Sequence, residues 1–195
     1  RGGRGKQAAA TKEDDFIDKM FVANTHDYIL CFSSLGQVYW LKVYEVPQGS
    51  RTSRGKPIVN LFPLSEGEKI NAILPVKEFD ENHFVFMATA MGTVKKTALV
   101  EFSNPRKSGI IAINLDDGDY LIGAEVTNGT QDIVLVSNGG KAVWFDEEDV
   151  RPMGRASRGV RGMRLQDNQQ LISLLVAEDA TQSVLVATEN GFGKR

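Results

Sequence analysis

The strongest constraint on the fold of this sequence is an internal repeat of roughly fifty residues. In each copy an apolar run ends in Ser or Thr, a Gly follows within three residues, and the apolar pattern then resumes. The runs are residues 29–33 before Gly36, 85–89 before Gly92, 133–137 before Gly140 and 184–188 before Gly191. Short runs rich in Val, Ile and Phe around a Gly-bearing turn are typical of β-hairpins. We therefore expect the same hairpin four times.

A second segment follows each of the first three hairpins at a nearly constant distance. It begins with Gly and ends with Leu, at residues 55–61, 109–115 and 159–165. An acidic or amide-rich turn comes next, at residues 66–68, 117–119 and 167–169. A further strand is expected to start at Ile70, Leu121 and Leu171, with Ile17 as its counterpart in the first copy.

These patterns predict an all-β, propeller-like array of four-stranded blades. No stretch shows sustained helical spacing of apolar residues, and repeats of this length are typical of propellers and solenoids. Four short strands cannot bury both faces alone, so successive units must pack around an axis. The fourth copy stops inside its hairpin, so we expect the 195 residues to be part of a longer array. We expect a basic, Gly-rich arm at residues 1–12 and the truncated repeat domain at residues 13–195.

Composition excludes several protein classes. No apolar run approaches the ~20 residues that span a bilayer, and no secretory signal opens the sequence. The single cysteine, Cys31, lies within a strand pattern and aligns with the apolar residues Met87, Leu135 and Val186, so it is expected to be a core residue. A cytoplasmic protein is therefore expected.

No catalytic or metal-binding constellation is predicted. His26 and His83 occupy matching polar connections in two repeats, which favours a structural role over catalysis. The acidic run 116–119 lacks the spacing of a calcium loop and matches the turn at 66–68. The opening residues 2–7 lack the preceding strand and the Ser or Thr of a phosphate loop. We therefore expect no cofactor.

The net charge of −2 argues against a nucleic-acid partner, but the distribution of charge favours one. Three spans, 48–60, 103–114 and 151–164, carry cations and no carboxylate, and they recur at one phase of the repeat, whereas carboxylates gather at other phases. Around an axis they would form one basic rim that contacts the backbone of double-stranded DNA without base preference. The expected DNA contacts within the repeats are Arg51, Arg54, Lys56, Lys95, Lys96, Arg106, Lys107, Lys141, Arg155, Arg158, Arg161 and Arg164.

Several of these segments resemble the C-terminal domain of the DNA gyrase A subunit. Residues 1–6 resemble most of its basic, Gly-rich box, and residues 54–56, 60–61, 91–97 and 158–163 resemble its repeats. The resemblance implies a β-pinwheel, a six-bladed disc whose neighbouring blades exchange a strand, of which about three and a half blades are present. The repeats alone are shared with the topoisomerase IV A subunit, so the box favours gyrase.

The resemblance also implies a function. The domain would wrap DNA with positive handedness and have no catalytic residues, while ATP and Mg²⁺ act elsewhere in a bacterial, nucleoid-associated enzyme that introduces negative supercoils. Its partners would be the rest of the gyrase A subunit and the gyrase B subunit in a heterotetramer. The box residues Arg1, Gly2, Gly3, Arg4, Gly5 and Lys6 inherit a DNA-wrapping role. This box departs from the family because its preceding polar residues are missing and Gln7 replaces a Gly.

Two alternatives to a gyrase domain stay open. The basic edge of a propeller-like scaffold could bind an acidic protein partner. The chain could also be the equivalent domain of the topoisomerase IV A subunit.

Overall fold

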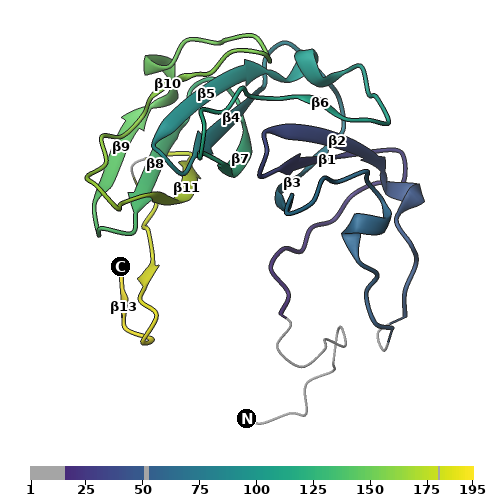
Figure 1. The fold of residues 1–195 in the computed structure, drawn as a ribbon, viewed down its shortest axis with the longest axis horizontal. Coiled ribbons are helices and arrows are strands. Elements are labelled where there is room, and N and C mark those ends of the chain that lie inside the picture. Colours follow the sequence, from purple (N-terminus) through teal and green to yellow (C-terminus); the bar gives the residue numbers. More distant parts are fainter. Residues whose placement is uncertain (1–15, 51–52, 180) are drawn as a thin grey trace.

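The computed structural model describes residues 16–50, 53–179 and 181–195, and it confirms the all-β prediction. The described residues form β-sheets arranged in an arc (Figure 1). Within these ranges the helical elements are the short 3-10 helices η1 (Val43–Glu45), η2 (Ile58–Asn60), η3 (Leu99–Phe102) and η4 (Glu147–Asp149).

Three of the four predicted hairpins are well formed. They are β1 (Tyr28–Ser33) with β2 (Gln37–Lys42), β4 (Phe84–Thr89) with β5 (Thr93–Ala98), and β8 (Asp132–Ser137) with β9 (Ala142–Asp146). The turn glycines Gly36, Gly92 and Gly140 have φ of +76°, +92° and +75°, a region that costs other residues strain. In the fourth, β12 (Val186–Ala187) pairs with β13 (Gly193–Lys194) over two residues each.

The inner strands begin at the predicted residues. These are β3 (Ile70–Val76), β7 (Leu121–Thr127) and β11 (Leu171–Ala177), which pair with β1, β4 and β8. The predicted turns precede them, with Gly67, Gly118 and Asn168 at φ of 77°, 78° and 63°. Neighbouring inner strands contact one another and line the concave side of the arc (Figure 1).

The prediction of a strand start at Ile17 is wrong, because residues 16–24 contain no strand. Each inner strand pairs back onto the hairpin that precedes it in sequence. Residues 16–24 pair with no strand in the described ranges, and Ile17 is 56% exposed.

Neighbouring blades exchange their outermost strand, as the resemblance implied. Blade 1 has the order β3-β1-β2-β6 and blade 2 the order β7-β4-β5-β10, while β11, β8 and β9 form blade 3. The strands β6 (Ile110–Ile111) and β10 (Val160–Arg161) thus belong by sequence to the next repeat. The first-copy counterpart, residues 55–61, contains η2 and no strand.

The hairpin glycines make this exchange possible. The Gly92 carbonyl accepts hydrogen bonds from the N–H groups of Gly162, at 2.8 Å, and Met163, at 3.1 Å. A Cβ atom at Gly92 would lie 2.5 Å from the Met163 carbonyl oxygen, and one at Gly36 would lie 2.5 Å from that of Ile113. Only glycine allows the exchanged segment to come this close.

The core lies between the blades. Strand β4 is buried on both faces: Val85 and Met87 pack into the cluster shared with blade 1, and Phe86 and Ala88 into the cluster shared with blade 3. This explains why β4 reads as a continuous apolar run. Cys31 is buried among core residues as predicted, and burial raises the pKa of its thiol to about 12.

Candidate nucleic-acid interface

The exchanged strands lie on the convex side of the arc (Figure 1). The loops at residues 103–109 and 151–159 lead into β6 and β10, and each loop lies where one repeat crosses onto the blade of another. We call these two loops together with β6 and β10 the outer rim. The architecture therefore brings the second and third basic spans to one perimeter.

Most of the predicted cations in the described ranges are solvent-exposed. On the outer rim, Arg106, Lys107, Arg158 and Arg161 are exposed and Arg155 is partly exposed. The remaining exposed cations of the predicted set are Lys141, Arg164, Arg54 and Lys56.

Two parts of the predicted set fall elsewhere. Arg54 and Lys56 belong to a loop at the N-terminal end of the arc that pairs with no strand in the described ranges (Figure 1). Arg51 and the box residues Arg1, Gly2, Gly3, Arg4, Gly5 and Lys6 lie outside the described residues, as does the expected boundary between residues 12 and 13.

A cavity of about 590 Å³ lies between the two rim loops. Arg106 comes from one loop and Arg155 from the other, and Glu101 and the backbone at Gly109 and Gly154 complete much of the lining. The two arginines favour an anion such as a phosphate in this cavity, whereas the Glu101 carboxylate opposes one; Gln37, Ile110, Ile111 and Ala156 complete the lining.

Lys95 corrects the sequence-based expectation, because its side chain is 0% exposed and faces no solvent. Its ammonium donates to the Ala112 carbonyl, at 2.6 Å, and to the Arg155 carbonyl. Lys95 therefore joins the segment that ends on blade 1 to the loop that leads onto blade 2. Burial lowers the pKa of Lys95 to about 8; Glu101 opposes this shift and Arg155 adds to it.

Lys96 is likewise buried and is not available to DNA, at 4% exposure. Its ammonium donates to the Glu147 main-chain carbonyl at 2.8 Å and lies 4.0 Å from the Glu147 carboxylate. That fully buried carboxylate also accepts from the Thr127 hydroxyl, at 2.7 Å, and the Gln131 N–H, at 2.9 Å. Trp40 holds the equivalent place in β2 and donates to the Phe102 carbonyl at 2.8 Å. The side chain at this position therefore joins one blade to the 3-10 helix of the next by a hydrogen bond.

Two rim arginines are paired with carboxylates of the preceding repeat. Arg158 Nη1 lies 3.0 Å from Asp116 Oδ1, and Arg155 Nε lies 3.9 Å from Glu101 Oε2. Arg155 also donates to the Ile111 carbonyl at 3.4 Å. The separation of acidic and basic phases along the sequence is thus not kept in space, because strand exchange folds the third basic loop over the second repeat. The sequence patterns did not identify Glu101 and Asp116 as partners of these arginines. Strand exchange brings residues of successive repeats together, so the carboxylate that pairs with each arginine lies one repeat earlier in the sequence.

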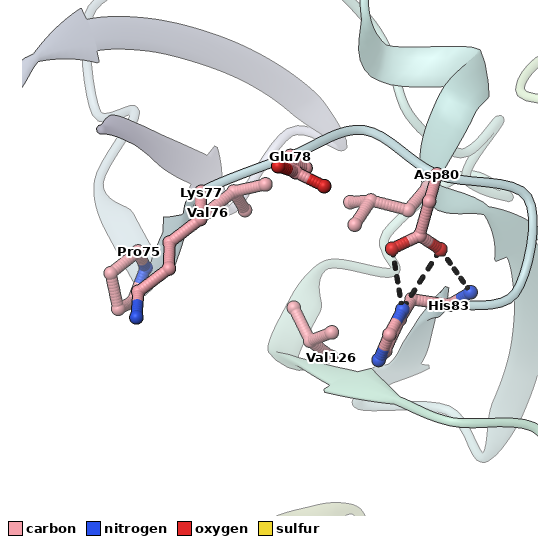
Figure 2. A pocket seen from close by; sticks show the side chains of 8 residues that line it. Pro75, Val76, Lys77, Glu78, Asp80, His83 and Val126 are labelled. Atoms are coloured by element: carbon pink, nitrogen blue, oxygen red, sulfur yellow. Dashed lines mark hydrogen bonds and ion pairs between the residues drawn. The ribbon is translucent and has the colours of Figure 1, made fainter. Parts of the chain in front are cut away.

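A second cavity, of about 340 Å³, holds a carboxylate and imidazole pair (Figure 2). His83 Nδ1 lies 2.8 Å from both carboxylate oxygens of Asp80, which also accepts from the N–H groups of Asn82 and His83. The hydrogen bond from His83 lowers the pKa of Asp80 most. The lining contains no Ser, Thr or Cys, and Lys77 points away from the pair (Figure 2). The contacts fix the turn at residues 80–83 and provide no nucleophile beside the base.

Across residues 16–50, 53–179 and 181–195, no group of three or more His, Cys, Asp or Glu side chains could hold a metal ion. No helix in this part of the chain is both long and apolar enough to cross a membrane.

The sequence matches the family model described as DNA gyrase C-terminal domain, beta-propeller, over residues 1–24, 27–77, 83–128, 131–178 and 182–195. Over its whole length it is 57% identical to the DNA gyrase A subunit of Salmonella typhimurium (strain LT2) and 55% identical to that of Escherichia coli (strain K12). It spans 22% of the length of each of these relatives.

Two solved structures share the fold over 96% of this chain. The C-terminal domain of DNA topoisomerase IV superposes with a TM-score of 0.86 at 32% identity, with 58% of that chain covered. A DNA gyrase A C-terminal domain superposes with a TM-score of 0.71 at 26% identity, with 62% of that chain covered.

Proposed function

Because this chain belongs to the DNA gyrase C-terminal domain family, we propose that it binds duplex DNA along the outer rim and bends it without base preference. One observation carries the proposal: strand exchange places Arg106, Arg155, Arg158 and Arg161 along one perimeter that crosses a repeat boundary. A curved line of cations suits a polymer with one negative charge per ~1.7 Å of helix axis, because each phosphate contact releases condensed counterions.

The proposed mode of binding follows from what the rim offers. The rim loops contain Gly and Ser, whose small side chains let main-chain N–H groups approach phosphate oxygens. Within the described ranges the helical elements are single 3-10 turns, too short to fill a major groove. Bending a few tens of base pairs costs on the order of 1–6 kcal/mol, which many phosphate contacts must offset.

In the whole enzyme this part would guide DNA and would carry out no chemistry. We propose that wrapping presents a contiguous DNA segment to the gate of a type II topoisomerase, so that ATP-driven strand passage leaves negative supercoils. The remainder of the gyrase A subunit and the gyrase B subunit would be its protein partners, and ATP and Mg²⁺ would bind there. The box residues Arg1 to Lys6 would extend the DNA contact beyond the rim.

Sequence identity favours gyrase over topoisomerase IV as the parent enzyme. The structural likeness to the topoisomerase IV domain is high, but identity to it is 32% against 57% for the Salmonella gyrase protein. Because the blade architecture is shared by both, the fold alone does not separate them.

The salt dependence of binding tests the proposal at residue level. We expect binding to a random-sequence duplex to weaken steeply with salt, and Arg106→Ala, Arg158→Ala or Arg161→Ala each to reduce the log-log slope by about 0.9 if it removes one phosphate contact. Lys77→Ala is the control, because Lys77 is exposed just beyond β3, an inner strand. An affinity that does not change with salt, or equal effects of all four variants, would refute rim binding. Capture of an acidic protein that duplex DNA cannot displace would favour the scaffold alternative.

A further inference from the structure

The arginines of the outer rim differ in whether a carboxylate pairs with them. Arg155 and Arg158 are paired with Glu101 and Asp116, as described above. In the part of the chain that the structure describes, no ion pair joins Arg106 or Arg161 to a carboxylate. The rim therefore contains two classes of arginine, paired and unpaired.

Both ion pairs cross a repeat boundary and are open to solvent. The side chains of Arg158 and Asp116 are 75% and 59% exposed, and those of Arg155 and Glu101 are 36% and 46% exposed. Glu101 also lines the rim cavity with Arg155 and Arg106. A phosphate that approached either paired arginine would therefore meet the carboxylate as well.

Glu101 and Asp116 do not stabilise the fold in the way that the buried ion pair between Lys96 and Glu147 does. Lys96 and Glu147 are 5% and 0% exposed, and their contacts join two blades inside the protein. The backbone around the rim arginines is fixed by other contacts, since Lys95 holds the Arg155 carbonyl and β10 pairs with β5. An exposed pair contributes little stability, equivalent to at most about a fivefold factor in an equilibrium constant, so an incoming phosphate can displace it.

We propose that Glu101 and Asp116 compete with DNA phosphates for Arg155 and Arg158, so that a duplex occupies this part of the rim by exchanging two ion pairs. This inference depends on the proposed DNA-binding function. The carboxylates lower the affinity of the rim, and they make Arg155 and Arg158 weaker contacts than Arg106 and Arg161. DNA held only loosely at the repeat boundary can be released there without loss of the other contacts.

Neutralising the carboxylates tests this competition directly. Asp116→Asn and Glu101→Gln should each tighten binding to a random-sequence duplex by about two- to fivefold, because the arginine then has no anionic partner in the free protein. The gain should shrink as salt is raised, since screening already weakens an exposed pair at a Debye length of ~10 Å in 0.1 M salt.

A matched control separates competition from a general change of charge. Asp117→Asn removes the same charge from the same turn, but in the described structure Asp117 forms no ion pair with an arginine. It should change affinity by clearly less than Asp116→Asn. In an Arg158→Ala background, Asp116→Asn should gain no more than Asp117→Asn does, because the competitor has lost its partner.

The outcomes are distinct. Equal gains from Asp116→Asn and Asp117→Asn would overturn the inference in favour of a general charge effect. Weaker binding by Glu101→Gln or Asp116→Asn would overturn it too, because the carboxylate would then orient its arginine toward DNA. If the unchanged chain shows no salt-dependent DNA binding, the proposed function fails and this inference with it, whereas binding without the variant effects refutes the inference alone. Unchanged unfolding midpoints would verify that the variants are folded.

Discussion

The exchange of strands between blades predicts a large difference between two alanine substitutions at equivalent glycines. Gly92 and Gly140 occupy the same hairpin position at φ of +92° and +75°. An alanine at Gly92 would place its Cβ 2.5 Å from the Met163 carbonyl oxygen, in the exchanged segment of the next repeat. At Gly140, no described atom would lie within 4 Å of the added Cβ. The pair therefore separates backbone strain from the contact with the exchanged strand.

The expected magnitudes follow from these two contributions. Left-handed backbone costs alanine about 1–2 kcal/mol, and both variants incur this cost. Only Gly92→Ala must also displace the segment that donates two hydrogen bonds to the Gly92 carbonyl, each worth about 1 kcal/mol net. We expect Gly92→Ala to lower the free energy of unfolding by about 3–4 kcal/mol and Gly140→Ala by about 1–2 kcal/mol.

Urea unfolding, followed by circular dichroism, measures the difference between the two variants. A gap of about 2 kcal/mol corresponds to roughly 4–8 °C between their thermal midpoints for a chain of this size. Gly36→Ala should match Gly92→Ala, because its Cβ would lie 2.5 Å from the Ile113 carbonyl oxygen. Equal losses for Gly92→Ala and Gly140→Ala would refute the account of the exchanged strand as a close structural contact.

Two further predictions concern the buried lysines. Lys96→Met should destabilise the protein by about 3–5 kcal/mol, because it leaves the Glu147 carboxylate buried without its cation. The Lys96→Met and Glu147→Gln double variant should lose less than the sum of the single losses in denaturant unfolding, and strict additivity would contradict this coupling. The pKa of Lys95 is lowered to about 8 in the folded protein, against 10.5 when the chain is unfolded. Between pH 8 and pH 10.5 the unfolded chain therefore binds more protons, so the contribution of Lys95 to the free energy of unfolding rises with pH. The stability of the unchanged protein relative to Lys95→Met should therefore rise between pH 8 and pH 10.5 in urea titrations, and a fall over that range would contradict it.

Much of the fold could be predicted because the same hairpin and turn pattern recurs along the sequence. The hairpin at residues 85–89 reads like those at 29–33 and 133–137, and the turns at Gly67, Gly118 and Asn168 marked where β3, β7 and β11 begin. Ile17 was the exception, because an inner strand also needs a hairpin to pair with, and residues 16–24 pair with none in the described ranges. The apolar pattern at Ile17 is a local feature of the sequence, whereas forming a strand requires another strand to pair with.

The candidate interface was less predictable, because charge in the sequence does not reveal exposure. Lys95 and Lys96 read as part of a basic stretch, yet both ammonium groups are buried against main-chain carbonyls of other segments. Trp40 occupies the same position in blade 1 and donates to the Phe102 carbonyl, so the hydrogen bond to the next blade recurs there without a charge. The pairing of Arg158 with Asp116 likewise depends on strand exchange; the resemblance implied that exchange, but not which residues it would bring together.

The central proposal, that this chain wraps DNA along its outer rim, is tested most directly by the writhe that the chain traps. Relaxed circular plasmid would be incubated with the chain and a nicking-closing enzyme, and the linking number of the purified DNA would be read by two-dimensional gel electrophoresis. We predict a shift toward positive linking number that grows with protein concentration and is reduced by Arg158→Ala and Arg161→Ala together. Retention of plasmid by the protein with no change in linking number would contradict wrapping.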